Sequence, residues 1–222
     1  MKAFAISDIH GCNETFNFLL EKIKLKKKHK LFLLGDYIDR GPDSKGVIDT
    51  ILKLRKSGYN TICLKGNHDS YVDVETGSPA WQSWMAQGGK QTLKSFGVQS
   101  FSEIDKKYRK FFKSLEYYSS HKKFYMVHAG FDFSLEKPFK DTYSMMWIRN
   151  MEYDAEKAKG KKIVHGHTPQ AMKKAIKANS NGSPLINIDF GCIYKKKTGM
   201  GYLCCYELGT DNYIVQKNVD NY

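Results

Sequence analysis

The chain has 222 residues and a formal net charge of +13, from 36 Lys and Arg residues against 23 Asp and Glu residues. This length suits one domain with a sizeable core, and we expect residues 1–222 to form it. No apolar run approaches the roughly 20 residues of a membrane-spanning helix, and none follows Lys2 as in a signal peptide. The five cysteines are odd in number and two are adjacent, which argues against a disulfide framework and predicts a cytoplasmic protein.

Residues 1–70 predict alternating strands and helices. Short apolar runs at 3–6, 31–34 and 61–64 are typical of buried parallel strands. Between them, apolar side chains recur at helical spacing over 13–26 and 42–58. This order predicts a β-α-β-α-β unit and the α/β fold class.

The rest of the chain predicts a helical insertion and a second sheet. The insertion covers about 71–118 and precedes two further apolar strands, at 124–127 and 162–164. After Pro169 the pattern changes to short segments separated by turn residues, and we expect these to form an antiparallel second sheet. The segments predicted as strands are 171–178, 185–189, 200–208 and 213–217.

Polar motifs follow five of the predicted strands. Loops at the carboxyl ends of strands in an open α/β sheet meet at one edge, so carboxylates, an amide and imidazoles should gather in one cleft. This is the ligand set of a binuclear metal site, and because it lacks a thiolate it suits Mn, Fe or Zn better than a structural zinc site. The motifs are Ser7-Asp8-Ile9-His10-Gly11, Gly35-Asp36-Tyr37-Ile38-Asp39-Arg40-Gly41, Gly66-Asn67-His68-Asp69, His128-Ala129-Gly130 and His165-Gly166-His167-Thr168.

These motifs resemble the signature of the calcineurin-like metallophosphoesterases. The resemblance is greatest to the phosphoprotein phosphatase (PPP) branch, which includes small bacterial members and members of the lambda-phage type. Further matches lie at 84–93 and at Trp147-Ile148-Arg149. The resemblance implies two packed mixed β-sheets flanked by helices. Three departures from the PPP pattern remove no ligand, and they are Ser7, Ile38 and Asp69.

The resemblance also implies a ligand set and a cofactor. Two divalent ions, which we expect to be Mn²⁺ with Fe or Zn as alternatives, would activate a water for direct attack on phosphorus. One ion would be held by Asp8, His10 and Asp36. The other would be held by Asp36, Asn67, His128 and His167.

Four further residues have roles that the resemblance implies. His68 would be the general acid that protonates the leaving alkoxide, and Asp39 would orient it. Arg40 and Arg149 would hold the phosphate oxygens. Taken alone, Asp39 also fits a turn and Arg40 a surface ion pair, but the surrounding heptapeptide favours the functional interpretation. His165 precedes the last ligand by two residues, and the motif register favours a supporting position for it without deciding whether it contributes to the site.

We therefore expect a metal-dependent phosphomonoesterase acting on phosphoserine and phosphothreonine, with phosphotyrosine as a further substrate. Its partner would be a phosphoprotein or a small phosphorylated molecule, and we expect no membrane partner. The main alternative is a symmetrical dinucleoside polyphosphate hydrolase acting on diadenosine tetraphosphate. A non-catalytic binding module and a nuclease are less favoured, because the ligand set is intact and Asp39 with Arg40 points to monoester chemistry. Lysine-rich runs at 22–30, 106–113 and 195–197 fit solvated faces, and scarce arginine argues against a specific nucleic-acid partner.

Overall fold

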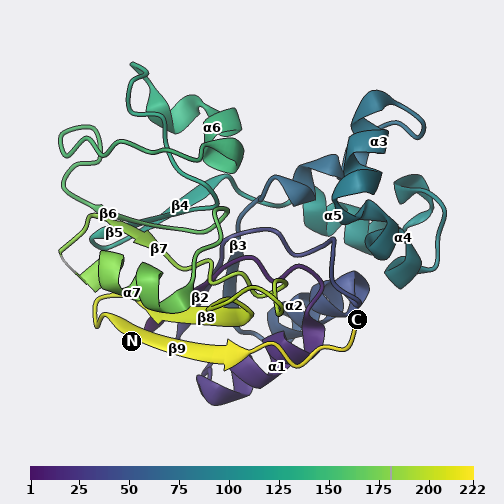
Figure 1. Ribbon diagram of the computed structural model, residues 1–222, viewed down its shortest axis with the longest axis horizontal. Helices are drawn as coiled ribbons and strands as arrows, with labels where there is room; N and C mark the ends of the chain where they lie inside the picture. Colours follow the sequence, from purple (N-terminus) through teal and green to yellow (C-terminus); the bar gives the residue numbers. More distant parts are fainter. Residues whose placement is uncertain (181) are drawn as a thin grey trace.

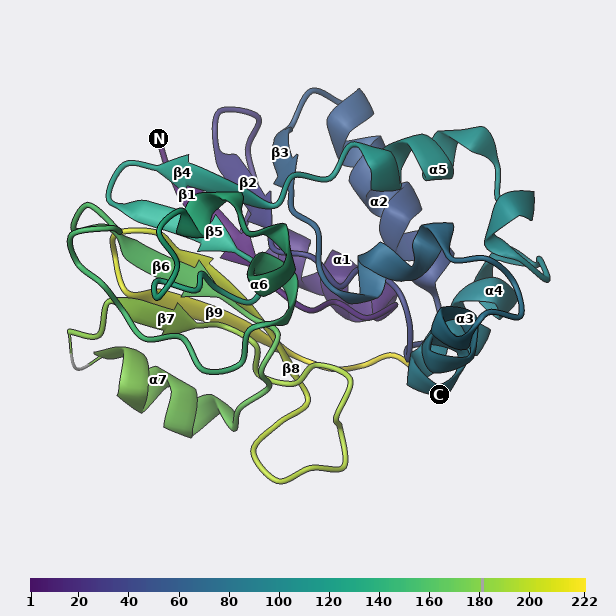
Figure 2. The same cartoon turned by 90° about the horizontal axis from the view of Figure 1, so that it is seen from above.

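Two β-sheets pack against each other in the computed structural model of the chain, which describes residues 1–180 and 182–222 (Figures 1 and 2). The five-stranded sheet has the order β3-β2-β1-β8-β9, and the four-stranded sheet has the order β4-β5-β6-β7. The strands are β1 (Ala3–Ile6), β2 (Lys30–Leu33), β3 (Asn60–Cys63), β4 (Tyr118–His121), β5 (Phe124–Val127), β6 (Lys162–His165), β7 (Leu185–Asn187), β8 (Tyr202–Glu207) and β9 (Asn212–Lys217).

Both sheets are mixed, which confirms the predicted fold class. Strands β1, β2 and β3 run parallel, whereas β8 is antiparallel to β1 and to β9. In the second sheet β5, β6 and β7 are parallel and β4 is antiparallel to β5. Ile6 pairs with Leu33, and Leu33 pairs with Cys63, so the loops after these three strands begin at the same edge.

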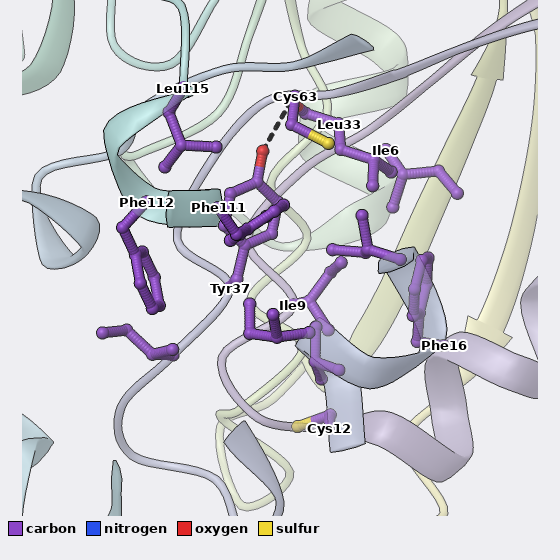
Figure 3. Packing of buried hydrophobic residues seen from close by; sticks show 14 of the residues in the cluster. Ile6, Ile9, Cys12, Phe16, Leu33, Tyr37, Cys63, Phe111, Phe112 and Leu115 are labelled. Carbon is purple, nitrogen blue, oxygen red and sulfur yellow. Dashed lines mark hydrogen bonds between the residues drawn. The ribbon is translucent and has the colours of Figure 1, made fainter. Parts of the chain in front are cut away.

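Helices cover the outer face of the five-stranded sheet. Side chains of α1, α2 and α5 form one buried cluster with Phe4, Ile6, Leu31 and Leu33, and Figure 3 shows part of it around Tyr37. The Tyr37 hydroxyl donates to the carbonyls of Leu33 (3.0 Å) and Leu64 (2.7 Å), which joins β2 to the end of β3. The helices are α1 (Asn13–Lys22), α2 (Ser44–Lys56), α3 (Pro79–Trp84), α4 (Lys90–Phe96), α5 (Lys106–Lys113), α6 (Thr142–Trp147) and α7 (Met172–Ser180).

A second buried cluster lies between the two sheets. Ala3 and Ala5 of β1 contribute to it, and the alternate residues of that strand face the helices instead. Phe124, Val164 and Ile186 contribute from the second sheet.

The prediction of a strand at 171–178 was wrong, because this segment lies in α7. Its apolar residues recur at helical spacing, and Ala175 is buried in the cluster between the sheets with Met172 and Ile176 packed against it. Alanine and lysine, which fill most of the segment, also have high helix propensity. The period of four residues was therefore the better guide than the change of pattern after Pro169.

The expectation of an antiparallel second sheet was also wrong. Strands β8 and β9 do form an antiparallel pair, but they extend the first sheet beside β1. Strand β7 joins the second sheet in parallel with β6. A local pattern predicts a strand and its hairpin, whereas the partner of the hairpin depends on which sheet edge is open in the folded chain.

No helix within the described ranges is long and apolar enough to cross a membrane. The five cysteines are free and buried, with 0–2% of their surface exposed.

Candidate metal centre

Loops from both sheets meet at one site. The backbone N–H of His10 donates to the Asp36 carbonyl (2.8 Å), which joins the loops after β1 and β2. The N–H of Gly166 donates to the carbonyl of His128 (2.8 Å), and the N–H of His167 donates to Asp8 Oδ2 (3.2 Å). The last contact joins the two sheets. A side chain on Gly166 would collide with Ser7 and Asp8, so only glycine fits this crossing.

One group of donor atoms comes from three loops. Nε2 of His128 lies 3.0 Å from Asn67 Oδ1 and 3.2 Å from Nδ1 of His167. Nδ1 of His167 lies 2.9 Å from the same amide oxygen. All three side chains are buried. These three atoms can all serve as metal ligands, and they carry too few protons to form all three hydrogen bonds with one another. Their convergence therefore fits a shared cation.

Asp36 lies between two histidines. Its Oδ1 is 3.5 Å from Nε2 of His128, and its Oδ2 is 3.5 Å from Nε2 of His10. Burial raises the pKa of Asp36, but the positive charge that His128, His68 and His10 carry when protonated outweighs burial and lowers the pKa below its ordinary value. This carboxylate has the position expected of a bridge between two cations.

The orientation of two imidazoles suits metal binding. Nδ1 of His10 lies 3.0 Å from the carbonyl of Ile38, and Nδ1 of His128 lies 2.9 Å from that of Leu34. A proton on each Nδ1 leaves a lone pair, rather than an N–H, on each Nε2, the ring nitrogen that lies near Asp36. Burial, followed by the charge of Arg40, lowers the pKa of His10 well below its ordinary value, so the ring is neutral as a ligand must be.

Two sets of donors among the described residues lie within 4.8 Å of one another. One contains Asp8, Asp36 and His128, and the other contains His10, Asp36 and His68. Both sets share Asp36. The second includes His68 where the sequence predicted Asp8, although both nitrogens of His68 are already in hydrogen bonds.

His68 is paired with the carboxylate of Asp39. Its Nδ1 lies 2.7 Å from Asp39 Oδ2, and both side chains are almost fully buried. Asp39 is fixed in turn by the Trp84 indole N–H, 2.9 Å from each carboxylate oxygen, and by the Thr92 hydroxyl at 2.6 Å. Trp84 and Thr92 lie in a segment that the sequence matched, but their contact with Asp39 was not predicted.

Arg40 connects the two sides of the site. Its guanidinium lies 2.8 Å from Nε2 of His10 and 2.7 Å from Nε2 of His68. The Arg40 backbone passes close to Gly88, whose φ of 118° and lack of a side chain permit the approach. A charged fork at this position can bind phosphate oxygens once its contacts with the imidazoles are released.

Backbone strain is concentrated at this site. Six of the ten non-glycine residues with positive φ in the described part of the chain belong to it. Such conformations cost about 1–3 kcal/mol each and persist only where the surrounding structure enforces them, which is typical of functional sites. The six are Asp8 (50°), His10 (47°), Asp36 (55°), Asp39 (73°), Arg40 (69°) and His167 (66°).

Two predicted residues lie beside this cluster. Arg149 is exposed and lines a cleft of about 380 Å³ together with His165, Thr168 and Asn187. His165 is the last residue of β6, and burial lowers its pKa to about 4. His165 belongs to neither of the two sets of three donors.

Asp69 has a structural role that the sequence did not reveal. It is buried and accepts backbone N–H bonds from Asp36 (2.7 Å), Tyr37 (3.1 Å) and Gly66 (2.9 Å). It therefore ties the second polar loop to the third. Its place directly after His68 was the only sequence signal.

Comparison with known proteins agrees with this geometry. Residues 1–202 match the calcineurin-like phosphoesterase family. A symmetrical bis(5′-nucleosyl)-tetraphosphatase of Buchnera aphidicola is 43% identical over 70 residues, which are 31% of this chain and 24% of the relative. One of Cellvibrio japonicus is 42% identical over 73 residues, 32% of this chain and 26% of the relative. The matched part thus spans about a quarter of the length of these relatives.

Solved structures share the fold at low sequence identity. A putative diadenosine tetraphosphatase has a TM-score of 0.66 at 18% identity, covering 100% of this chain and 94% of its own. A protein serine/threonine phosphatase from Saccharomyces cerevisiae has a TM-score of 0.71 at 16% identity, covering 100% of this chain and 81% of its own.

Proposed function

We propose that this chain, which belongs to the calcineurin-like phosphoesterase family, is a two-metal hydrolase of phosphate esters and anhydrides. The observation that carries the proposal is the position of Asp36, shared by two sets of donors beside the His68–Asp39 pair. A site with an acid next to paired cations is suited to displacing a leaving group from phosphorus.

The chain's own residues would divide the work. Asp8, His10 and Asp36 would hold one ion, and Asp36, Asn67, His128 and His167 the other. Bound there, the ions would supply an activated water and neutralise charge on the phosphoryl group. We propose Mn²⁺ because the donor set mixes oxygen and imidazole nitrogen.

His68 would protonate the leaving oxygen from Nε2, while Asp39 keeps the proton-bearing Nδ1 in place. For His10 to bind a metal through Nε2, Arg40 would release that atom. Its guanidinium would then be free to hold two phosphoryl oxygens. Arg149, exposed at the adjoining cleft, would hold a more distant phosphate.

Dinucleoside polyphosphates are the substrates that we favour. The relatives from Buchnera aphidicola and Cellvibrio japonicus are named symmetrical bis(5′-nucleosyl)-tetraphosphatases. Clefts also lie beside both predicted phosphate clamps: one of about 380 Å³ at Arg149, and one of about 450 Å³ lined by Arg40, Gln87 and Lys90. A cleft beside each of the two arginines suits a polyphosphate with a group at each end.

A phosphoprotein is the second candidate substrate. The buried His68–Asp39 pair is the observation that favours it, because an alkoxide such as serine needs a proton to leave. A nucleoside diphosphate leaves as a stable anion and needs the acid less.

The free, buried cysteines accord with the cytoplasmic location that we propose.

One substrate panel tests this proposal. The Mn²⁺-loaded protein would be assayed on diadenosine tetraphosphate, a phosphoserine peptide and a phosphodiester, with product analysis. We expect hydrolysis of the tetraphosphate to two molecules of ADP and loss of activity on chelation. Faster cleavage of the phosphopeptide would make the protein a phosphatase of the second kind, and cleavage of the diester alone would contradict both candidates.

A further inference from the structure

We propose that Tyr143, Trp147 and Tyr71 form an aromatic wall at which a nucleobase of the substrate stacks. The inference rests on the proposed function, because it concerns the group attached to the phosphate that this site would cleave. It adds a subsite that makes no use of the metal ligands themselves.

The aromatic wall begins at the centre of the site. The Tyr71 ring lies 6.4 Å from the ring of His68 with an interplanar angle of 67°. The Trp147 ring lies 6.4 Å from that of His167 and 6.1 Å from that of Tyr71, nearly perpendicular to both. Trp147 thus adjoins both the predicted acid side and the predicted metal side.

The wall ends in solvent at Tyr143. This ring is stacked on Trp147 at 6.2 Å with an interplanar angle of 20°, and 69% of the residue is exposed. Among the described residues, the aromatic side chains that are exposed are Phe18, Tyr143 and Tyr222, and Tyr143 is the one whose ring stacks on Trp147. An open face next to two further rings can accept another planar group by offset stacking.

Helix α6 holds the outer end of the wall in place. Asp141 caps the helix by accepting from the backbone N–H groups of Tyr143 (3.1 Å) and Ser144 (3.4 Å). The carbonyl of Met145, which is buried, accepts from the N–H of Ala129 (2.8 Å), the residue after His128. The rings are therefore presented by a helix that is bonded directly to the metal-site loop. In Figure 1, α6 lies above the strands of the four-stranded sheet, whereas α3, α4 and α5 form a separate group at the right.

The position of the acid identifies what should meet this wall. If His68 protonates the leaving oxygen, the rest of the leaving group extends past His68, and Tyr71 is the ring that contacts it. A nucleoside places a planar base a few bonds beyond its phosphate. Gln87 donates to the Tyr71 hydroxyl (2.9 Å) and lines the cleft beside Arg40, so polar groups suited to a sugar adjoin the rings.

A pair of ligands that differ only in the base tests the proposal. AMP and ribose 5-phosphate share their phosphate and sugar. We would measure their competition constants against p-nitrophenyl phosphate with the Mn²⁺-loaded protein, and the quenching of tryptophan fluorescence by AMP. Stacking of a base on an aromatic side chain has a typical worth of about five- to 150-fold in affinity. We expect AMP to bind more tightly than ribose 5-phosphate by a factor in this range.

Variants at Tyr143 localise the effect. In Tyr143→Leu, the ratio of the affinity for AMP to that for ribose 5-phosphate should fall towards one. In Tyr143→Phe, which keeps the ring, the ratio should be retained. Phe18→Leu, at an exposed ring on α1 outside the site, is the matched control and should change nothing. Equal binding of AMP and ribose 5-phosphate by the unaltered protein, or an unchanged preference in Tyr143→Leu, would overturn the proposal.

Two further outcomes separate the inference from the proposed function. Phenyl phosphate would be measured in the same competition assay. If it binds more tightly than ribose 5-phosphate while AMP does not, the rings accept a phenyl group, and the nucleobase assignment would be overturned. Quenching by AMP that depends on Tyr143, in a protein that hydrolyses no phosphate compound, would support the aromatic wall while contradicting the proposed function.

Discussion

At the scale of single residues, Asp36 connects the two halves of the candidate metal site. Its two oxygens face histidines from different loops, and it is the one member common to both sets of three donors. The strained φ of 55° at Asp36 and the bond from its N–H to Asp69 show how tightly the fold specifies this position. The residues around Asp36 can therefore be tested separately for metal binding and for proton transfer.

Substitution of the acid should separate chemistry from assembly. In His68→Asn we expect the metal content to persist and turnover of an alkyl phosphate to fall by about 10²–10⁴, the usual worth of a positioned proton donor. The loss should be smaller on p-nitrophenyl phosphate, whose leaving group needs little protonation. Steady-state rates on both substrates, with elemental analysis, measure this. Because His68 also belongs to a donor set, loss of metal would identify it as a ligand.

The two histidines of the last motif give a matched pair of variants. His167→Ala should lower the bound metal from two towards one per chain and remove most activity, since its Nδ1 faces Asn67 and His128. His165→Ala should retain both metals and cost at most about 10–100-fold in affinity or activity, as a change beside a ligand does. Elemental analysis of both proteins decides the assignment. A metal lost from His165→Ala but not from His167→Ala would show that the ligands are misassigned.

At the scale of elements, the polar loops were predictable and their supports were not. The three parallel strands end in register, so motifs that follow them must converge, and this could be deduced from apolar runs alone. Trp84 and Thr92 meet Asp39 only because the segment after β3 folds back over the site. No local sequence pattern predicts how this segment folds back. The same limitation explains why β8 was predicted as a strand but assigned to the wrong sheet.

A contact distant in sequence fixes the start of α1. The residue before the helix, Cys12, provides no side-chain cap. Asp220, which is buried, accepts from the backbone N–H groups of Glu14 and Thr15, each at 3.0 Å. The helix begins directly after the loop of Asp8 and His10. Asp220 therefore supports the metal loop from the opposite end of the sequence.

Removal of this cap should lower the free energy of unfolding. For Asp220→Ala we expect a loss of about 1–3 kcal/mol, because buried donors are left without partners. Urea unfolding followed by circular dichroism measures it. Glu136→Ala is the control, since this side chain is 87% exposed and its ion pair with Lys137 should contribute little. Equal unfolding free energies for Asp220→Ala and the unaltered protein would show that α1 needs no cap from this residue.

At the scale of the whole molecule, the net charge of +13 should act on substrate capture. A polyphosphate carries several negative charges, so a positive protein attracts it over a distance set by the ionic strength. We expect kcat/KM for diadenosine tetraphosphate to fall as KCl is raised from 20 to 500 mM (roughly a fourfold to fivefold shorter screening length), while kcat changes little. A kcat/KM that is independent of salt would mean that the lysine-rich faces play no part in capture.

The central claim is that two metal ions share Asp36, and metal stoichiometry tests it most directly. Elemental analysis of the Mn²⁺-reconstituted protein should find two ions per chain. Asp36→Ala should lose both, because each donor set loses its common carboxylate, and its hydrolytic activity should fall to that of the chelated protein. Full activity after exhaustive chelation with no bound metal, or an Asp36→Ala protein that keeps two ions, would contradict the account.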